Sequence, residues 1–265
     1  MQAFVITALA GLATSIGGVL GIHRRVLHGS VLAFALAFAV GAMVLVSFVE
    51  LLPVGFESLV ESGWASAAIW LTGGTFVLGL FAVASLDRFL PSPPSPTEVE
   101  AGELDALSHQ THASRKLFRS GALVALVLAL HNFPEGMSTF FAASQDLSSG
   151  LVLAIAIAIH NIPEGIAVAA PIYAATGDRR KAFWWATFSG VAEPIGALIG
   201  FGIISMFVPT TYIGLLYGFV AGMMTYVALT ELLPAARNYA PKLWHIGSGA
   251  LAGMSVMVVS ILLVM

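Results

Sequence analysis

Two near-identical hexapeptides contain the residues of this chain best suited to chemistry. They read His-Asn-x-Pro-Glu-Gly, occupy residues 131–136 and 160–165, and each lies inside an apolar segment. Imidazole, amide and carboxylate groups ligate divalent cations, and burying a carboxylate in a membrane helix is costly unless something compensates its charge. A bound cation is the simplest compensation, so the repeated motif predicts an intramembrane metal site.

The polar residues of each hexapeptide share one face of a helix. His131 and Glu135 are four residues apart, and Asn132 lies three residues before Glu135, which are the spacings of neighbours on a helix surface. The second motif repeats the pattern with His160, Asn161 and Glu164. The proline in each motif removes a backbone donor and kinks a helix, which opens room for an ion or water.

A third carboxylate, Glu193, ends the run Ser-Gly-Val-Ala-Glu in another apolar segment and is followed by a proline. No Lys or Arg lies in the apolar segments to pair with Glu135, Glu164 and Glu193, so three charges there would be uncompensated. Two divalent cations would more than neutralise them, and one cation with a proton would also balance them, so both counts stay open. The residues predicted to form the metal site are His131, Asn132, Glu135, His160, Asn161, Glu164 and Glu193.

Taken one at a time, these residues have a simpler explanation. A buried His often packs through hydrogen bonds, and a lone membrane Glu can be protonated and neutral. The same spacing occurring twice, with a third carboxylate, favours ligands instead. The chain has no cysteine, and imidazole, carboxylate and amide groups without thiolate suit Zn²⁺, Fe²⁺, Mn²⁺ or Co²⁺.

The composition identifies the elements that must position these groups. The 265 residues are 58% hydrophobic and 9% charged, with a mean hydropathy of +0.93, which indicates an all-α integral membrane protein. We expect the first apolar stretch to be a retained span rather than a cleaved signal peptide. Eight apolar stretches are each long enough to cross a hydrocarbon core of about 30 Å: 3–22, 31–52, 67–86, 120–141, 150–173, 183–207, 211–236 and 246–264.

Positive charge gives an independent check on eight spans. With that count, all eleven Lys and Arg residues fall in loops on one side of the membrane, which the positive-inside rule assigns to the cytoplasm. Both termini are then extracytoplasmic. The largest of these loops, residues 90–118, is Pro-rich and acidic, so we expect a flexible cytoplasmic loop within a single domain spanning 1–265. It contains His109 and His112, which are either solvated or capture metal.

The predicted topology makes the repeated sequences antiparallel. The hexapeptides lie in spans 4 and 5, which cross in opposite directions. Glu-Leu-Leu-Pro likewise occurs at residues 50–53 near the outer end of span 2 and at 231–234 near the inner end of span 7. We therefore predict inverted repeats, spans 1–3 and 6–8, around the span 4/5 pair, an arrangement typical of secondary transporters. Glu50 and Glu231 are either interfacial carboxylates or secondary sites along the pathway.

Small residues recur at helix-packing spacing in three of the predicted spans. Their pairs are Gly17 with Gly21, Gly196 with Gly200, and Gly249 with Gly253. Such spacing lets membrane helices approach closely, although glycine is common in membrane helices in any case.

On these residues the chain resembles the ZIP (Zrt-, Irt-like) family of metal transporters, in its bacterial ZupT-type branch. Both hexapeptides carry the resemblance, which covers essentially the whole chain. Supporting segments are residues 47–53, 171–177, 189–193 and 253–257. The resemblance implies eight helices in the bacterial cytoplasmic (inner) membrane and import of divalent metals, with zinc, iron, manganese, cobalt and cadmium as cargo.

The resemblance also implies how the ligands divide. One metal position would use His131, Glu135, His160 and Glu164, with Glu193 as a further candidate. The adjacent position would use Asn132, Glu135, Asn161, Glu164 and Glu193, with glutamates bridging. Some relatives carry Gln-Asp in place of His160 and Asn161, so metal preference does not transfer directly. The metals are cargo rather than a prosthetic group, the partner surface is the lipid bilayer, and we expect no nucleic-acid partner. A homodimer is compatible with the sequence, which leaves the oligomeric state open.

Two other classes of protein bury metal ligands in a membrane. An intramembrane metal-dependent hydrolase would activate water on the metal, but the chain lacks His-Glu-x-x-His. A metal-regulated receptor or structural membrane protein is the other alternative. Neither explains the inverted repeats, so we predict a transporter rather than an enzyme.

Overall fold

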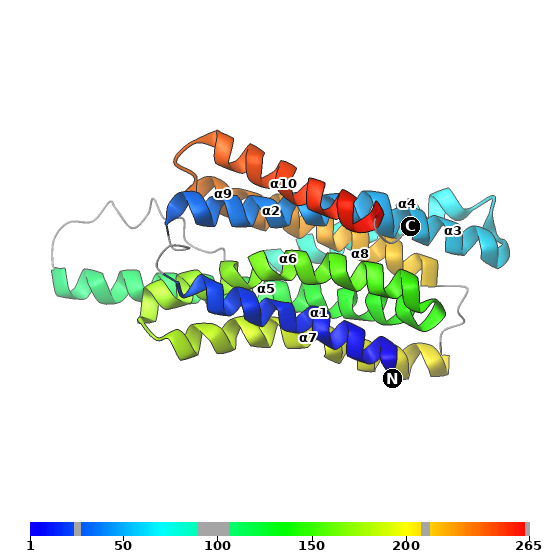
Figure 1. Cartoon of the computed structure of the whole chain (residues 1–265), viewed down its shortest axis with the longest axis horizontal. Coiled ribbons are helices and arrows are strands. Elements are labelled where there is room, and N and C mark those ends of the chain that lie inside the picture. The colour runs from blue at the N-terminus through cyan, green and yellow to red at the C-terminus, as the bar shows by residue number, and fades with distance from the viewer. Residues whose placement is uncertain (24–27, 90–105, 208–212, 263–265) are drawn as a thin grey trace.

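The computed structural model describes residues 1–23, 28–89, 106–207 and 213–262. Within these ranges the secondary structure is entirely helical, and the helices run side by side along the long axis of the molecule (Figure 1). The elements in chain order are α1 (Gln2–Gly21), α2 (Gly29–Val46), η1 (Ser47–Leu51), α3 (Leu52–Leu59), η2 (Val60–Trp64), α4 (Ala68–Phe89), α5 (Ala106–Gln145), α6 (Leu147–Thr176), α7 (Arg179–Phe207), α8 (Ile213–Val227), η5 (Ala228–Leu232), α9 (Leu233–Tyr239) and α10 (Leu243–Leu262).

Two of the long helices are interrupted by π-helical turns rather than broken. Helices α2 and α3 join through η1 into one rod, Gly29–Trp64, and α8 and α9 join through η5 into another, Ile213–Tyr239. Both turns end at Glu-Leu, and in each case a proline follows in the first turn of the next helix. The matching Glu-Leu-Leu-Pro segments thus have matching backbone geometry.

Six helical segments among the described residues are long and apolar enough to cross a membrane. They are Gln2–Gly21, Gly29–Trp64, Ala68–Ser85, Leu147–Thr176, Ile213–Tyr239 and Leu243–Leu262. Each coincides with a predicted span, and the other two predicted spans lie in α5 and α7. The prediction of an all-helical, multi-pass membrane protein is therefore confirmed.

The segment predicted as a cytoplasmic loop, 90–118, divides in the structure. Residues 90–105 lie outside the described residues, and 106–118 form the first part of α5, which extends beyond the other helices at one end of the molecule (Figure 1). Its backbone is helical there because the acidic and proline-rich residues precede 106, and the sequence after it contains mostly residues that helices tolerate. His109 and His112 lie on this helix, and their side chains are outside the described part of the structure.

The first group of helices, α1, α5, α6 and α7, packs backbone to backbone. A Cβ added to Gly17 would overlap the carbonyl oxygen of Ile162, and one added to Gly165 would overlap that of Thr14. These contacts join α1 to α6. Glycines 136 and 196 make the same kind of contact between α5 and α7. Only glycine permits such approach, which maximises dispersion contacts where lipid supplies no hydrophobic drive.

The second group, α2, α4, α8 and α10, is built the same way. Gly41 and Gly253 lie against carbonyl oxygens between α2 and α10, and Gly79 and Gly222 do so between α4 and α8. The six glycines predicted at small-residue spacing all lie against a neighbouring helix of their own group. Among the described glycines, none meets the backbone of the other group.

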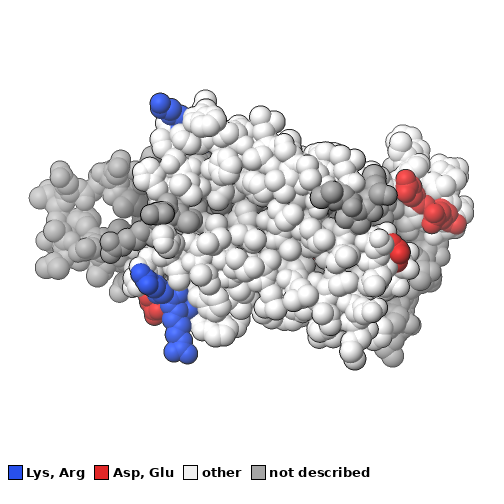
Figure 2. Space-filling view, viewed as in Figure 1, with Lys and Arg blue, Asp and Glu red and all other residues white. Residues whose placement is uncertain are grey.

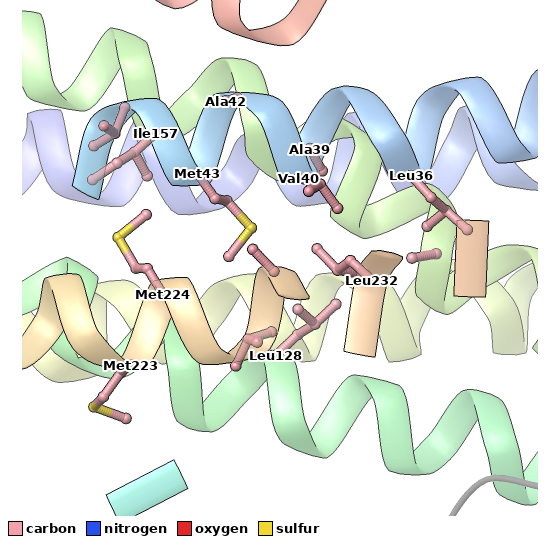
Figure 3. Close-up of a cluster of buried hydrophobic side chains, with 14 of the residues drawn as sticks. Leu36, Ala39, Val40, Ala42, Met43, Leu128, Ile157, Met223, Met224 and Leu232 are labelled. Carbon is pink, nitrogen blue, oxygen red and sulfur yellow. The ribbon is translucent and has the colours of Figure 1, made fainter. Parts of the chain in front are cut away.

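The two groups meet through side chains. Helix α2 contacts α6, and α8 contacts α5, and the boundary is filled by buried apolar residues from all four helices (Figure 3). Met43 and Met224 point into the space between α2 and α8 (Figure 3). Flexible methionine side chains adapt to irregular gaps, and this boundary uses them where each group internally uses glycine contacts.

Candidate metal site

The two hexapeptides lie on neighbouring helices. Residues 131–136 belong to α5 and 160–165 to α6, and these helices pack against each other. Helix α6 stays continuous from Leu147 to Thr176 although Pro163 and Pro171 lie inside it. Glu193 comes from α7, which packs against both. The structure thus places the three segments that carry the predicted ligands on helices that pack against one another.

Six of the seven predicted site residues are fully buried. The side chains of Glu135, Glu164 and Glu193, together with His160 and both asparagines, have no solvent exposure. The seventh, His131, lies on α5, and its side chain is outside the described part of the structure. Buried carboxylates demand compensation by protons, donors or cations, and no described Lys or Arg is buried beside them.

A histidine–carboxylate contact links the two hexapeptides. Nε2 of His160 lies 3.2 Å from Oε1 of Glu135, which joins α6 to α5. With Nε2 protonated, the imidazole donates to the carboxylate. The contact holds both groups at one point between the helices, where a cation could replace the proton they share.

Both asparagine side chains are anchored by their amide nitrogens. Nδ2 of Asn161 donates to the carbonyl oxygen of Ala10 at 3.0 Å and to the Glu193 carboxylate. Nδ2 of Asn132 donates to the carbonyl oxygen of Ser189 at 3.2 Å. The two amide oxygens meet no hydrogen-bond donor among the described residues. Each asparagine therefore presents a fixed oxygen, a group that coordinates divalent cations.

The third carboxylate faces the other two. Glu193 lies close enough to Glu135 and Glu164 for their charges to interact, and its Oε2 has no hydrogen-bond partner in the described part of the chain. The described His, Asp and Glu side chains do not form a group of three or more at the spacing of a metal shell. A complete shell around a cation therefore requires the asparagine oxygens, or a small movement of the carboxylates, in addition.

The structure adds one wall of the site that the sequence did not indicate. Helix α1 passes directly beside Glu193, because Gly11 lies against the backbone of Gly190 and its added Cβ would be 3.1 Å from Cβ of Glu193. Ala10 on this turn supplies the carbonyl that anchors Asn161. A backbone carbonyl has no sequence signature, so only the recurrence of glycines at matching places in α1 and α7 could have indicated this contact.

The two secondary candidates occupy equivalent places outside this cluster. Glu50 lies on η1 and Glu231 on η5, and both are partly buried. The six buried residues lie on α5, α6 and α7, whereas these two carboxylates lie on the π-turns of the second group of helices.

An all-helical, multi-pass fold around buried imidazole, amide and carboxylate groups defines a membrane protein built to handle cations within its interior. Residues 94–261 match the family model described as ZIP zinc transporter. The chain belongs to this family. It is therefore a transporter and not an enzyme, which excludes the hydrolase alternative.

Bacterial relatives extend the similarity over almost the whole chain. The zinc transporter ZupT of Corynebacterium glutamicum is 43% identical over 263 residues, covering 98% of both chains. That of Nitratidesulfovibrio vulgaris is 44% identical over 269 residues, covering 99% of this chain and 97% of its own. That of Streptococcus mutans is 39% identical over 262 residues, covering 98% and 97%.

Proposed function

We propose that this protein carries divalent cations into the bacterial cytoplasm through the site formed by the two hexapeptides and Glu193. The observation that carries the proposal is the complete burial of six imidazole, amide and carboxylate side chains contributed by three packed helices. The similar bacterial proteins are named zinc transporters, which makes zinc the first cargo to test. The same ligand types also suit iron, manganese and cobalt, and cadmium is a further candidate.

We propose eight membrane spans, with α5 and α7 as spans 4 and 6. Figure 1 places both termini toward the end of the molecule opposite the α6–α7 and α9–α10 turns. These turns carry the basic residues Arg179, Arg180, Lys181, Arg237 and Lys242. Figure 2 likewise has the visible Lys and Arg at one end and most visible acidic groups at the other. By the positive-inside rule the basic end is cytoplasmic, and both termini are extracytoplasmic in the inner membrane.

An inverted repeat is supported by the register of the packing contacts. Gly17 packs on the carbonyl of Ile162, and Gly196 packs on the carbonyl of Phe133. Gly17 and Gly196 occupy matching positions in the two proposed halves, and so do Ile162 and Phe133. The contacts of α2 with α10 and of α8 with α4 match in the same way. A two-fold relation between antiparallel halves places a shared site near the middle of the membrane.

The proposed mechanism is alternating access at the side-chain boundary between the two groups of helices. A cation enters from the outside, exchanges water for the buried ligands, and leaves inward when the site-bearing group shifts against the other. A membrane potential of 100 mV, negative inside, favours inward movement of a divalent ion by about 4.6 kcal/mol. The chain has no Gly-rich phosphate-binding motif, so the potential and the metal gradient are the energy sources we propose.

The test is uptake of labelled Zn²⁺, Fe²⁺ and Mn²⁺ into sealed proteoliposomes with an imposed inward-negative potential. We expect saturable uptake by the wild type, and a loss of about a hundredfold in Glu135→Ala and Glu164→Ala because each removes a ligand from a buried shell. Glu57→Ala is the matched control, since Glu57 is an exposed glutamate on α3. Metal binding without flux in the wild type would overturn the proposal and favour a sensor.

A further inference from the structure

The two fully buried hydroxyls of α1, on Thr7 and Thr14, differ in how they are satisfied, and the partly buried Ser15 beside Thr14 also lacks a partner among the described residues. Membrane-helix hydroxyls usually donate to the carbonyl one turn earlier, as Thr7 does to Ala3 at 3.0 Å and Ser47 does to Met43 at 2.8 Å. Thr14 is fully buried on the same helix as Thr7. Its Oγ1 has no hydrogen-bond partner in the described part of the structure. An unsatisfied hydroxyl in an apolar interior is costly and requires an explanation.

Thr14 lies between the two helices that flank α1 at the site. Its Oγ1 is 2.8 Å from the position that a Cβ on Gly190 would occupy. Gly190 follows Ser189, whose carbonyl oxygen accepts the hydrogen bond from Asn132. On its other side, the carbonyl oxygen of Thr14 is the atom against which Gly165 packs, next to Glu164. The free hydroxyl is thus held beside the metal site.

The matching positions of α1 and α7 give this residue a counterpart. Ala10 and Ser189 each accept a hydrogen bond from a site asparagine, and the next residues, Gly11 and Gly190, pack against each other. Three positions further along, the counterpart of Thr14 is Glu193. Their backbones also match, since Gly165 lies on the carbonyl of Thr14 as Gly136 lies on that of Glu193.

We propose that the Thr14 hydroxyl is a further cation-binding oxygen, the neutral counterpart of the Glu193 carboxylate. The inference rests on the proposed function. Helix α1 runs inward and α7 outward in the proposed topology, so Glu193 lies on the outer side of the Gly11–Gly190 contact and Thr14 on the inner side. Gly136 lies on the carbonyl oxygen of Glu193 and Gly165 on that of Thr14, so the neighbouring Glu135 belongs with Glu193 on the outer side and Glu164 with Thr14 on the inner side.

The consequence is a site with unequal halves. The outer half holds two carboxylates, whereas the inner half holds one carboxylate and a hydroxyl. A cation first binds the two carboxylates on the outer side. It then passes to the inner side, where the neutral Thr14 hydroxyl binds it more weakly, and leaves into the cytoplasm. A symmetric site with a fourth carboxylate would bind as tightly on the inner side and release the metal slowly.

The experiment compares Zn²⁺ and Mn²⁺ uptake into proteoliposomes with equilibrium binding of the same metals in detergent. Thr14→Val keeps the shape and removes the oxygen, Thr14→Ser keeps the oxygen, and Thr7→Val is the matched control on the same helix. We expect Thr14→Val to lose about tenfold in uptake, with Mn²⁺ affected more than Zn²⁺ because manganese favours oxygen ligands. Thr14→Ser and Thr7→Val should keep wild-type uptake and the wild-type ratio of the two metals.

A second variant makes the opposite change. Thr14→Asp places a carboxylate on the inner side, so we expect tighter Zn²⁺ binding together with slower uptake. Uptake and metal ratio in Thr14→Val equal to those of Thr7→Val would overturn the inference, as would wild-type binding and flux in Thr14→Asp. Failure of the proposed function is distinguishable, because it would abolish uptake in the wild type itself.

Discussion

The two groups of helices share one packing scheme and bury different chemistry. In both, glycines lie against carbonyl oxygens of neighbouring helices. Among the described residues, the fully buried carboxylates, histidine and asparagines all belong to the group α1, α5, α6 and α7, which also buries hydroxyls, whereas the buried polar side chains of the group α2, α4, α8 and α10 are hydroxyls alone. Of these hydroxyls, Ser47 and Thr225 donate to a carbonyl of their own helix, and Thr72 has no partner among the described residues.

This difference separates scaffold from function. Backbone-to-backbone packing requires glycine at the contact points and does not depend on the side chains on the other faces of the helices. The site-bearing group uses its free faces for ligands, and the second group uses them for apolar side chains that contact the first. Replacing a packing glycine should therefore lower stability in either group of helices. Replacing a buried polar residue should affect transport only when it lies in the site-bearing group.

The largest effect is expected from breaking the packing scheme itself. Gly136→Val and Gly41→Val both force side chains into a carbonyl oxygen of the neighbouring helix, and overpacking of this kind costs about 1–3 kcal/mol or more. We expect both variants to lose thermal stability in detergent to a similar extent. Gly73→Ala is the control, because no atom lies within 4 Å of its added Cβ. A stable Gly136→Val would contradict the close approach described here.

Carboxylates on the two groups should differ in their effect on uptake. Glu193→Gln removes a charge from the fully buried cluster, so we expect a loss of about a hundredfold. Glu50→Gln and Glu231→Gln act on partly buried π-turn residues outside the cluster, and we expect losses of about twofold to fivefold at most for a weak, secondary role. The measurement is initial Zn²⁺ uptake into proteoliposomes at matched protein content. Equal losses in all three variants would remove the distinction between the two groups.

The smallest effect concerns a helix end of the site-bearing group. Asp146 caps α6 by accepting hydrogen bonds at 2.7 Å from the backbone N–H and the hydroxyl of Ser149, and these bonds lower the pKa of its carboxyl group. Because the folded pKa is the lower one, the stabilisation is present above the unfolded pKa and is lost as pH falls through the folded value. Asp146→Ala should lower the melting temperature slightly at neutral pH, and the difference from wild type should vanish in acid. A pH-independent difference would assign the effect to packing instead.

Much of the site could be predicted because its residues are rare in apolar helices. Asn132, Asn161 and the three carboxylates contrast with everything around them, and the repeated spacing placed them on helix faces without any tertiary information. Their role as metal ligands stays a prediction. The fold class and the family were equally accessible, since apolar length and the hexapeptides are read directly from the chain.

The parts that escaped prediction depend on groups without a distinctive side chain. The wall formed by α1 works through the carbonyl of Ala10 and the hydroxyl of Thr14, both of which look like ordinary membrane-helix residues in sequence. The π-turns arise from backbone hydrogen bonding within an unbroken apolar run, so hydropathy cannot detect them. The helical start of α5 lies in a polar region where composition favoured a loop.

The two π-turns record something of the history of this chain. A π-turn arises when one residue is inserted into an α-helix, and such turns are rare in proteins. Of the three π-turns among the described residues, two occur at matching sequences, Ser47–Leu51 and Ala228–Leu232, each followed by Leu-Pro. Inheritance of one insertion is simpler than two independent insertions at equivalent positions. Under the proposed repeat, the insertion therefore predates the duplication that joined the two halves, and both copies have kept it.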